Sequence, residues 1–164
     1  MLSGWLILTQ KYETMQIINR KLVKDEVKKA SELFDLYVAV FAQDSQSFIA
    51  PNILYLEQLL QKENILLYVA EYEGKVVGGL TAYVLPSIHR EDNEIYIYDL
   101  AVASQHQRQG IGSNLVKYLF EDLKKQNVKY VYVQADKVDD EAIAFYKKLG
   151  GKQEDVYHFD FELK

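Results

Sequence analysis

Tyr98-Asp99-Leu100-Ala101-Val102 and, shortly after it, Gln107-Arg108-Gln109-Gly110-Ile111-Gly112-Ser113 form the most informative stretch of this chain. An apolar strand here runs through a glycine-rich turn directly into a helix. Glycines let the backbone approach an anion closely. The unpaired backbone N–H groups at the start of the helix donate hydrogen bonds to the anion, and the positive end of the helix dipole attracts it. The pattern predicts a phosphate-binding turn, although a Gly-x-Gly before a helix is also common in purely structural turns.

Two nucleotide-binding motifs can be tested against these residues. A P-loop requires a Lys-Ser/Thr pair after the glycines, and a dinucleotide fingerprint requires G-x-G-x-x-G in an early βαβ unit. Neither is met. What remains is Q/R-x-x-G-x-G/A after a strand, with Gln107, Gly110 and Gly112 at its defined positions. This resembles the pyrophosphate loop of the GNAT superfamily of acyl-CoA-dependent N-acetyltransferases, and Ala144-Phe145-Tyr146-Lys147-Lys148-Leu149-Gly150 resembles its second motif.

A closer resemblance is to the aminoglycoside 3-N-acetyltransferases of this superfamily. It runs from about Met15 to Asp160. The resemblance implies an α/β fold with a mixed, mostly antiparallel sheet flanked by helices, and an activity that acetylates a polycationic amine. The segments that carry it are Glu94-Ile95-Tyr96-Ile97-Tyr98-Asp99-Leu100-Ala101-Val102, Tyr132-Val133-Gln134-Ala135-Asp136 with Asp139-Asp140, and His158-Phe159-Asp160.

Hydrophobic periodicity predicts the elements around the glycine-rich turn. Apolar residues recur at three- and four-residue steps from Val27 to Phe41, as on one face of a helix, and Glu73-Gly74 is a turn pair between two apolar β-type runs. The predicted helices lie at about 24–42, 51–61, 110–126 and 142–149. The predicted strands lie at about 16–22, 65–72, 75–85, 94–102, 128–135 and 156–163.

Length and composition favour one globular domain. The chain has 164 residues, 49% of them hydrophobic and 26% charged, and no apolar run is long enough to span a membrane. We expect one acetyltransferase domain over residues 15–164, with residues 1–14 an extension or a mis-assigned start. The apolar run near Trp5 lacks the flanks of a signal peptide. The absence of Cys excludes disulfides and thiol nucleophiles, so we expect a cytoplasmic protein.

Charge limits the partners. The formal net charge is -5, which gives no global field for nucleic acid, and we expect neither nucleic acid nor a membrane as partner. A small cationic amine fits the negative charge of the protein better. The sequence leaves undecided whether the protein forms a homodimer. His89, His106 and His158 are scattered without metal-ligand spacing, so we expect no metal.

Three residues are candidates for proton transfer. Asp99 lies among apolar residues, where burial raises the pKa of a carboxyl toward the range useful for a base; a strand-end carboxylate bonded to backbone is the alternative. Glu94, acting through water, is the second candidate base. The resemblance implies that Tyr146 donates a proton to the leaving CoA thiolate, whereas its helix position alone also suits a core tyrosine.

The alternation of side chains along a strand determines which face of the sheet carries each of the two carboxylates, Glu94 and Asp99. It places Glu94, Tyr96 and Tyr98 on one face and Asp99 on the other, unless a β-bulge re-aims the chain. The sequence leaves both arrangements open.

Acidic residues near the end of the chain are candidates for binding a polycationic acceptor. We expect an acidic rim that attracts a polycationic amine, formed by Asp136, Asp139, Asp140 and Asp160, and the resemblance points the same way. Tyr98 is a further candidate for binding the acceptor. Each carboxylate alone also suits a turn or surface role, and Asp139 is well placed to cap the following helix.

The resemblance assigns the cofactor residues to acetyl-CoA. Backbone of Leu100, Ala101 and Val102 is expected to pair with pantetheine, with the Leu100 N–H at the oxyanion, and residues 107–113 are expected to hold the pyrophosphate. With no Cys and no Ser-His elbow, transfer is expected to be direct. The alternatives are an acetyltransferase for polyamines or protein amines, and a non-catalytic CoA-binding module.

Overall fold

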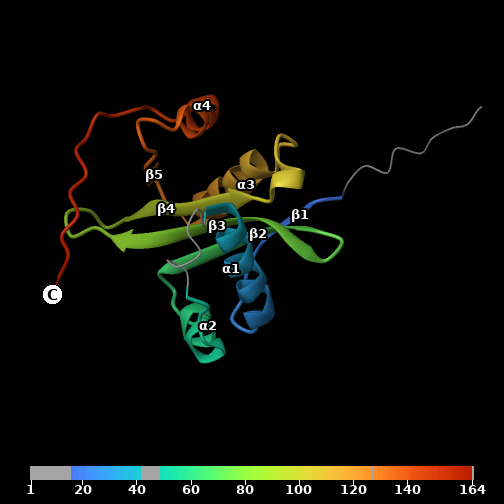
Figure 1. Ribbon diagram of the computed structural model, residues 1–164. Coiled ribbons are helices and arrows are strands. Elements are labelled where there is room, and N and C mark those ends of the chain that lie inside the picture. The colour runs from blue at the N-terminus through green and yellow to red at the C-terminus, as the bar shows by residue number, and fades with distance from the viewer. Residues whose placement is uncertain (1–15, 42–48, 127, 164) are drawn as a thin grey trace, which may run out of the picture.

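The computed structural model describes residues 16–41, 49–126 and 128–163, so the expectation for residues 1–14 lies outside it. Within these ranges four α-helices and five strands alternate as in an α/β protein (Figure 1). The helices are α1 (Val27–Phe41), α2 (Ile53–Leu60), α3 (Ile111–Lys125) and α4 (Asp140–Lys148). The strands are β1 (Ile18–Lys21), β2 (Ile65–Tyr72), β3 (Lys75–Pro86), β4 (Asn93–Val102) and β5 (Tyr130–Val133), and a short 3-10 helix, η1, covers Ser104–His106.

The strands form one sheet in the order β1-β2-β3-β4-β5. Neighbours are antiparallel except β4 and β5, which are parallel, so the sheet is mixed and mostly antiparallel as predicted. Glu73 and Gly74 both have positive φ, +49° and +73°, as the tight turn between β2 and β3 requires. β5 pairs only with Glu94–Ile97, so the second half of β4 leaves the side toward β5 free of that strand.

Helices cover both faces of the sheet. Leu33 and Leu36 of α1 and Leu56 of α2 share one core with the β2 residues Leu67 and Val69. On the opposite face, α3 buries an apolar stripe against the sheet, consisting of Ile111, Leu115, Val116, Leu119 and Leu123. Phe145 of α4 and Leu149, just after the helix, pack against this second core. No helix in the described ranges has the length and apolar character needed to cross a membrane.

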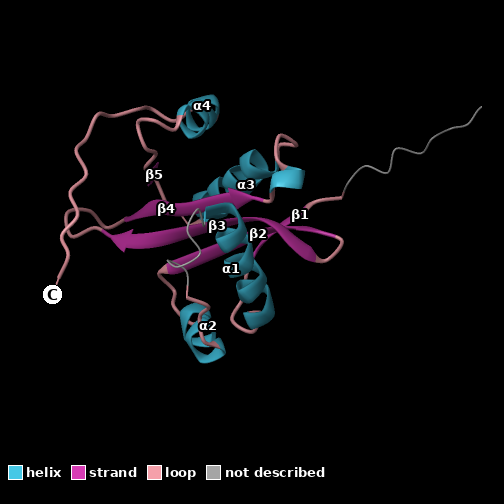
Figure 2. Cartoon of the chain, viewed as in Figure 1, coloured by secondary structure: helices cyan, strands magenta, loops and turns pink. Residues whose placement is uncertain are grey.

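The strand predicted over 156–163 does not form. Residues 151–163 run as an extended loop in which every residue is exposed (Figure 2). The predicted stop of α4 is confirmed, since Gly150 has a φ of +93° just past the helix. A strand also needs a neighbour for its backbone N–H and C=O groups, and this segment has none in the described part of the chain. The prediction of a strand over residues 156–163 was therefore wrong.

Candidate functional site

A β-bulge in the middle of β4 determines where Asp99 lies. Thr81 of β3 is paired with Asp99, but the next residue, Ala82, is paired with Ile97, which leaves Tyr98 as an extra residue. Ile97 is buried in the core beneath α3, whereas Asp99 faces the side of α1 and α2. Without the bulge, alternation would put these two side chains on the same face. The sequence left open which face of the sheet carries Asp99. The bulge turns this side chain to the face covered by α1 and α2.

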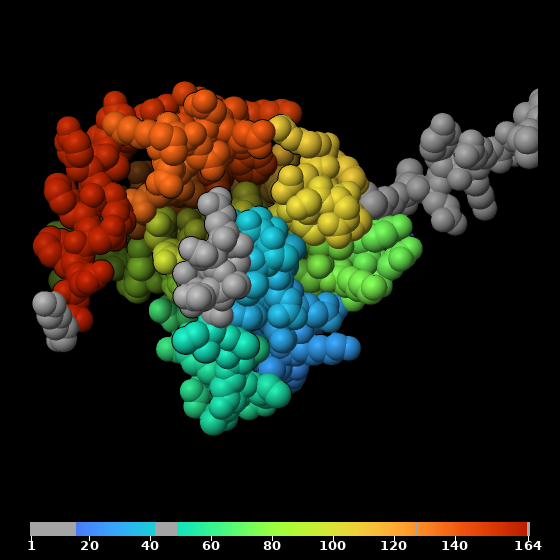
Figure 3. Space-filling model, in the orientation of Figure 1, coloured from blue at the N-terminus to red at the C-terminus, as the bar shows by residue number. Residues whose placement is uncertain are grey.

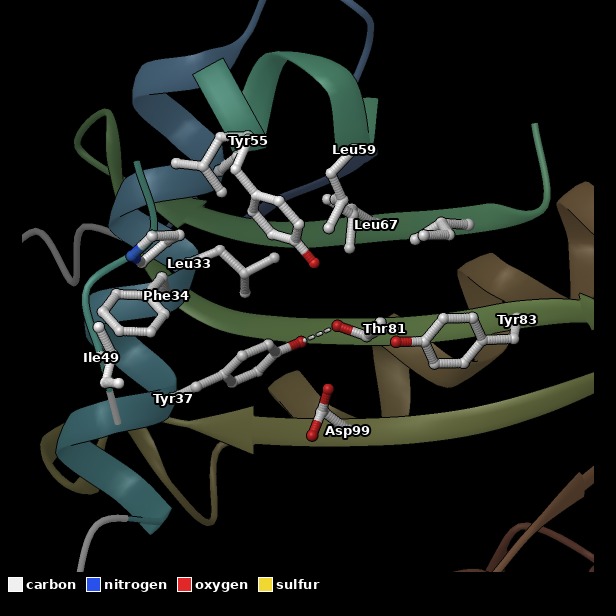
Figure 4. Close-up of a pocket in the computed structure, with 14 residues that line it drawn as sticks. Leu33, Phe34, Tyr37, Ile49, Tyr55, Leu59, Leu67, Thr81, Tyr83 and Asp99 are labelled. Atoms are coloured by element: carbon white, nitrogen blue, oxygen red, sulfur yellow. Dashed lines mark hydrogen bonds between the residues drawn. The ribbon is translucent and has the colours of Figure 1, made fainter. Parts of the chain in front are cut away.

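Asp99 lies at the wall of a cavity of about 280 Å³ between the sheet and the first two helices. Most of the wall is apolar, and polar groups converge on one side of it. Figure 4 shows the hydroxyl groups of Tyr37, Tyr55 and Tyr83 pointing toward the space beside Thr81 and Asp99. The lining residues are Ala30, Leu33, Phe34, Tyr37, Ile49, Pro51, Tyr55, Leu56, Leu59, Ile65, Leu67, Thr81, Tyr83 and Asp99.

Thr81 connects Asp99 to Tyr37. The Tyr37 hydroxyl and Thr81 Oγ1 are 2.8 Å apart, in hydrogen-bond contact, and Thr81 lies directly opposite Asp99 across the two strands. Burial raises the pKa of Asp99, and hydrogen bonding with Thr81 offsets part of this rise. A hydroxyl has one proton, so a Thr81 that donates to Asp99 accepts from Tyr37. The three groups then form one relay that ends on the carboxylate.

Two of the tyrosines near Asp99, Tyr37 and Tyr83, are held in their neutral form. Burial raises the pKa of Tyr37 far above its ordinary value; the Thr81 hydrogen bond partly opposes this rise, and the negative charge of Asp99 adds to it. Burial also raises the pKa of Tyr83, and Asp99 is the second cause. These phenols therefore act as hydrogen-bond donors and apolar surfaces at neutral pH. One desolvated carboxylate lies among them.

The glycine-rich turn has the backbone of an anion site. Gly110 is the residue before α3, with a φ of +82°, and no side chain caps the helix there. Arg108 also has positive φ, at +60°. The first amides of a helix have no partner within it, and the helix dipole makes this end positive. Gln107 Nε2 donates to the Val102 carbonyl at 3.0 Å, which ties the turn to the end of β4.

Two contacts place α4 against this turn. Arg108 Nη2 and Glu141 Oε1 are 2.8 Å apart, and a Cβ added to Gly112 would lie 3.6 Å from the Phe145 ring. Tyr146 follows Phe145, with ring centroids 5.1 Å apart. Burial, followed by the charge of Asp139, raises the pKa of Tyr146 to about 12. The structure therefore brings the predicted cofactor turn and the predicted acid onto adjoining elements.

The remaining predicted residues lie elsewhere. Glu94 forms an ion pair with Arg90 at the start of β4 and does not line the cavity. Its partner on β3 is four residues from the partner of Asp99, which separates the two carboxylates by about 13 Å along the sheet. Asp136 is exposed in the loop after β5, and Asp160 is exposed on the C-terminal segment, 2.9 Å from His158. Tyr98 is 60% exposed and contacts Tyr83 edge-on.

Asp139 has the structural role considered for it in the sequence. Its side chain caps α4 by accepting from the Ala142 N–H at 2.8 Å. Within the described ranges, no three His, Asp or Glu side chains are grouped closely enough to hold a metal ion.

Sequence reasoning missed Tyr37 and Thr81. The pattern of α1 identified Tyr37 only as part of an apolar stripe, and Thr81 sits in a strand where β-branched residues are expected. The available signal was Thr81 itself, because it is a polar residue within a run of apolar and small residues. In the structure Thr81 is only 6% exposed. Buried polar groups are normally hydrogen-bonded, so such a residue indicates a polar partner across the core.

Comparisons with known proteins agree on one family. The family described as Acetyltransferase (GNAT) family matches residues 28–151. An aminoglycoside acetyltransferase, meta-AAC0020, from an uncultured soil metagenomic sample in complex with sisomicin is 38% identical, with a TM-score of 0.86 and coverage of 90% of this chain and 97% of that one.

Two further relatives are named for different acetyltransferase activities. The aminoglycoside acetyltransferase HMB0005, from an uncultured soil metagenomic sample, is 36% identical with a TM-score of 0.85 and coverage of 92% and 100%. An N-alpha-acetyltransferase of Sulfurisphaera tokodaii is 30% identical over 126 residues, which cover 68% of this chain and 72% of that protein.

Proposed function

The chain belongs to the acetyltransferase (GNAT) family and is an acetyl-transferring enzyme, and from that premise we propose that it transfers acetyl from acetyl-CoA to an amine of an aminoglycoside. The observation that carries the proposal is the cavity that contains Asp99. A desolvated carboxylate among tyrosine hydroxyls is suited to an ammonium group on a polyhydroxylated ligand. The likeness to two aminoglycoside acetyltransferases supports the same acceptor.

The residues present fit acetyl-CoA, which supplies an acetyl thioester when bound. The side of β4 beyond Ile97 is free of β5, so the backbone of Leu100–Val102 can pair with an extended amide-containing chain. The uncapped start of α3 after Gly110 offers amides to a pyrophosphate. In this proposal residues 107–113 bind the anion, while Leu100 N–H stabilises negative charge on the carbonyl oxygen.

Asp99 and Tyr146 have complementary proton tasks in this mechanism. An amine attacks a carbonyl carbon only as the free base, so Asp99 accepts a proton from the bound ammonium. Its raised pKa makes it a stronger base than an exposed aspartate. Tyr146 holds a proton at its hydroxyl and donates it to sulfur as the C–S bond breaks. Once the N–C bond has formed, the nitrogen loses a second proton, which restores the Tyr146 phenolate to the phenol. The net reaction therefore converts ammonium and thioester into amide, thiol and the one proton held by Asp99.

The experiment is a thiol-release assay over three amine classes: sisomicin and gentamicin-like aminoglycosides, spermidine, and a peptide with a free N-terminus. We expect saturable release with aminoglycosides and acetylation on a deoxystreptamine-type amine, identified by mass spectrometry. Saturable acetylation of only spermidine or the peptide would contradict the assigned acceptor. The peptide arm is included because of the relative named as an N-alpha-acetyltransferase.

A further inference from the structure

Four tyrosines lie side by side across β3, β4 and β5, on the face of the sheet that carries Asp99. Tyr83, Tyr96 and Tyr132 are direct partners on the three strands, so their side chains share one face. The residues before Tyr96 and Tyr132, Ile95 and Val131, belong to the core beneath α3, which puts the tyrosines on the opposite face. These residues, here called the tyrosine row, are Tyr83, Tyr96, Tyr98 and Tyr132.

Ring contacts connect all four members of the tyrosine row. The rings of Tyr96 and Tyr132 stack, with centroids 4.9 Å apart and planes 16° apart. Tyr98, the extra residue of the β-bulge, meets Tyr96 and Tyr83 edge-on, with centroids 5.7 Å and 5.4 Å away. The Tyr96 hydroxyl donates to Gln134 Oε1 at 2.8 Å. Each ring is therefore oriented by its neighbours, so a ligand would meet a preorganised aromatic surface.

The tyrosine row is not needed to fill a hydrophobic core. Within the part of the chain that the structure describes, none of the four rings packs into either core, and Tyr98 is 60% exposed. Figure 3 shows the surface of β3 and β4 recessed between α1 and α2 on one side and α4 with the segment after it on the other. Aromatic side chains gathered on an exposed, recessed surface are typical of a binding site.

Tyr83 joins the tyrosine row to the cavity of Asp99. It lines that cavity, and Figure 4 shows its hydroxyl directed toward Thr81. Tyr83 is two residues from Thr81, the partner of Asp99, so the row begins about 7 Å along the sheet from the carboxylate. Burial is the main cause of the raised pKa of Tyr96, and the negative charge of Asp99 adds to it. A ligand whose amine lies at Asp99 therefore has its next ring beside the row.

We propose that the tyrosine row binds a second amino-sugar ring of the acceptor while Asp99 receives the amine that is acetylated, an inference that rests on the proposed function. The C–H face of a pyranose ring is apolar and packs on aromatic rings, and its ammonium groups are attracted to their faces. The tyrosine hydroxyls exchange hydrogen bonds with sugar hydroxyls. The row therefore selects acceptors that have a second ring linked to the one that reacts.

Two acceptors separate this ring site from the site of the amine: sisomicin, which has linked rings, and 2-deoxystreptamine, a single ring that carries the reacting amines. Tyr98→Leu removes the most exposed ring of the row but keeps an apolar side chain. We expect its kcat/KM to fall about 10-fold for sisomicin and less than about 2-fold for 2-deoxystreptamine. Tyr132→Leu should give the same selective loss, whereas Tyr98→Phe, which keeps the ring, should stay within about 3-fold of the unaltered protein.

Tyr118→Leu is the matched control on the opposite face of the sheet. Tyr118 lies on α3, is 41% exposed and meets Tyr68 edge-on. The same substitution there should leave kcat/KM unchanged for both acceptors. Equal losses for sisomicin and 2-deoxystreptamine in Tyr98→Leu, or equal effects of Tyr98→Leu and Tyr118→Leu, would overturn the proposal.

Saturation-transfer NMR detects the ring contact without turnover. Irradiation of the aromatic protons of the protein should transfer saturation to C–H protons of a sisomicin ring other than deoxystreptamine, and severalfold less in Tyr98→Leu and Tyr132→Leu. If the unaltered protein shows this transfer but releases no thiol with any aminoglycoside, the proposed acceptor is wrong and the tyrosine row is still a sugar site. Transfer confined to the deoxystreptamine ring, or unchanged in both variants, would overturn the assignment of the row.

Discussion

Burial raises the pKa of Asp99, and the hydrogen bond with Thr81 opposes part of that rise. Thr81→Val removes that hydrogen bond and leaves the Tyr37 hydroxyl without its partner. The pKa of Asp99 is therefore expected to rise further, which moves the acid limb of the kcat/KM profile to higher pH. An unsatisfied buried hydroxyl also costs about 1–3 kcal/mol of stability. Rates measured from about pH 5 to 9 check the shift.

Thr81→Ser is the matched control for this prediction because it keeps Oγ. It should preserve the wild-type acid limb while losing only the packing of one methyl group, about 1 kcal/mol. An acid limb that moves equally in the Val and Ser variants would show that packing, not the hydrogen bond, accounts for the change.

A raised pKa at Asp99 also has a consequence for stability. The folded state binds the proton more tightly than the unfolded chain does, so stability falls as pH rises from the unfolded pKa of about 3.9 through the folded pKa. At pH 7 the ionised side chain is therefore destabilising. Asp99→Asn should raise Tm by a few degrees at pH 7 and by less near pH 4, where less of the destabilising negative charge is present, while activity falls about 100-fold or more. Thermal melts at the two pH values provide the measurement.

The opposite stability result would count against Asp99 as a desolvated base. If Asp99→Asn lowers Tm at pH 7, the ionised carboxylate makes favourable contacts in the folded state. If Glu94→Gln abolishes activity while Asp99→Asn does not, the base is Glu94 acting through water.

Tyr146 is expected to stay protonated throughout the working range because its pKa is about 12. Tyr146→Phe removes the donated proton, so kcat should fall about 100-fold while KM for acetyl-CoA changes little. The wild-type rate should show no loss from ionisation of this phenol up to about pH 10. Steady-state kinetics on both proteins test this, and an unchanged kcat in the Phe variant would remove Tyr146 from the mechanism.

At the scale of elements, the position of α1 over β3 depends on a glycine. A Cβ added to Gly79 would lie 2.0 Å from Leu33 Cδ1 and 3.5 Å from the Tyr37 hydroxyl. Gly79→Ala should therefore push α1 from the sheet, with a stability loss of about 1–3 kcal/mol and a fall in kcat/KM because Tyr37 moves with the helix. Denaturant unfolding and kinetics measure the two effects.

Gly112→Ala is the matched comparison. Its Cβ would make only ordinary contacts of 3.6 Å with Phe145 and Val102, so stability should change by less than about 0.5 kcal/mol. Any functional effect should instead appear in KM for acetyl-CoA, because the new methyl group stands at the anion-binding turn. Equal stability losses in the two variants would contradict the close approach of α1 and β3.

Some helices and strands could be predicted from the sequence, and others could not. The hairpin of β2 and β3 and the helices α1 and α3 were predictable because each has a clear period and a local turn signal. The bulge at Tyr98 was not, since it depends on how β3 and β4 pair rather than on local residues. It nevertheless decides that Asp99 faces the cavity. The prediction of a C-terminal strand was wrong because an alternating pattern is a local property of the sequence. Whether a strand forms depends on a pairing partner that the local sequence does not specify.

For the whole molecule, the net charge of -5 gives a long-range attraction for a polycation and none for a neutral acceptor. Asp136 and Asp160 are exposed, so their contribution must be screened by salt, with a Debye length of about 10 Å at 0.1 M and about 3 Å at 1 M. KM for an aminoglycoside should therefore rise severalfold between these concentrations.

Single substitutions separate this field from local chemistry. Asp136→Asn and Asp160→Asn should each raise the aminoglycoside KM more than they lower kcat, and each should flatten the salt dependence, because the charge removed lies outside the cavity of Asp99. KM for acetyl-CoA, an anion, should not rise with salt in the same way, which serves as the internal control. An aminoglycoside KM that stays constant with ionic strength would mean that the desolvated Asp99 and its tyrosines, rather than the charge of the molecule, select the acceptor.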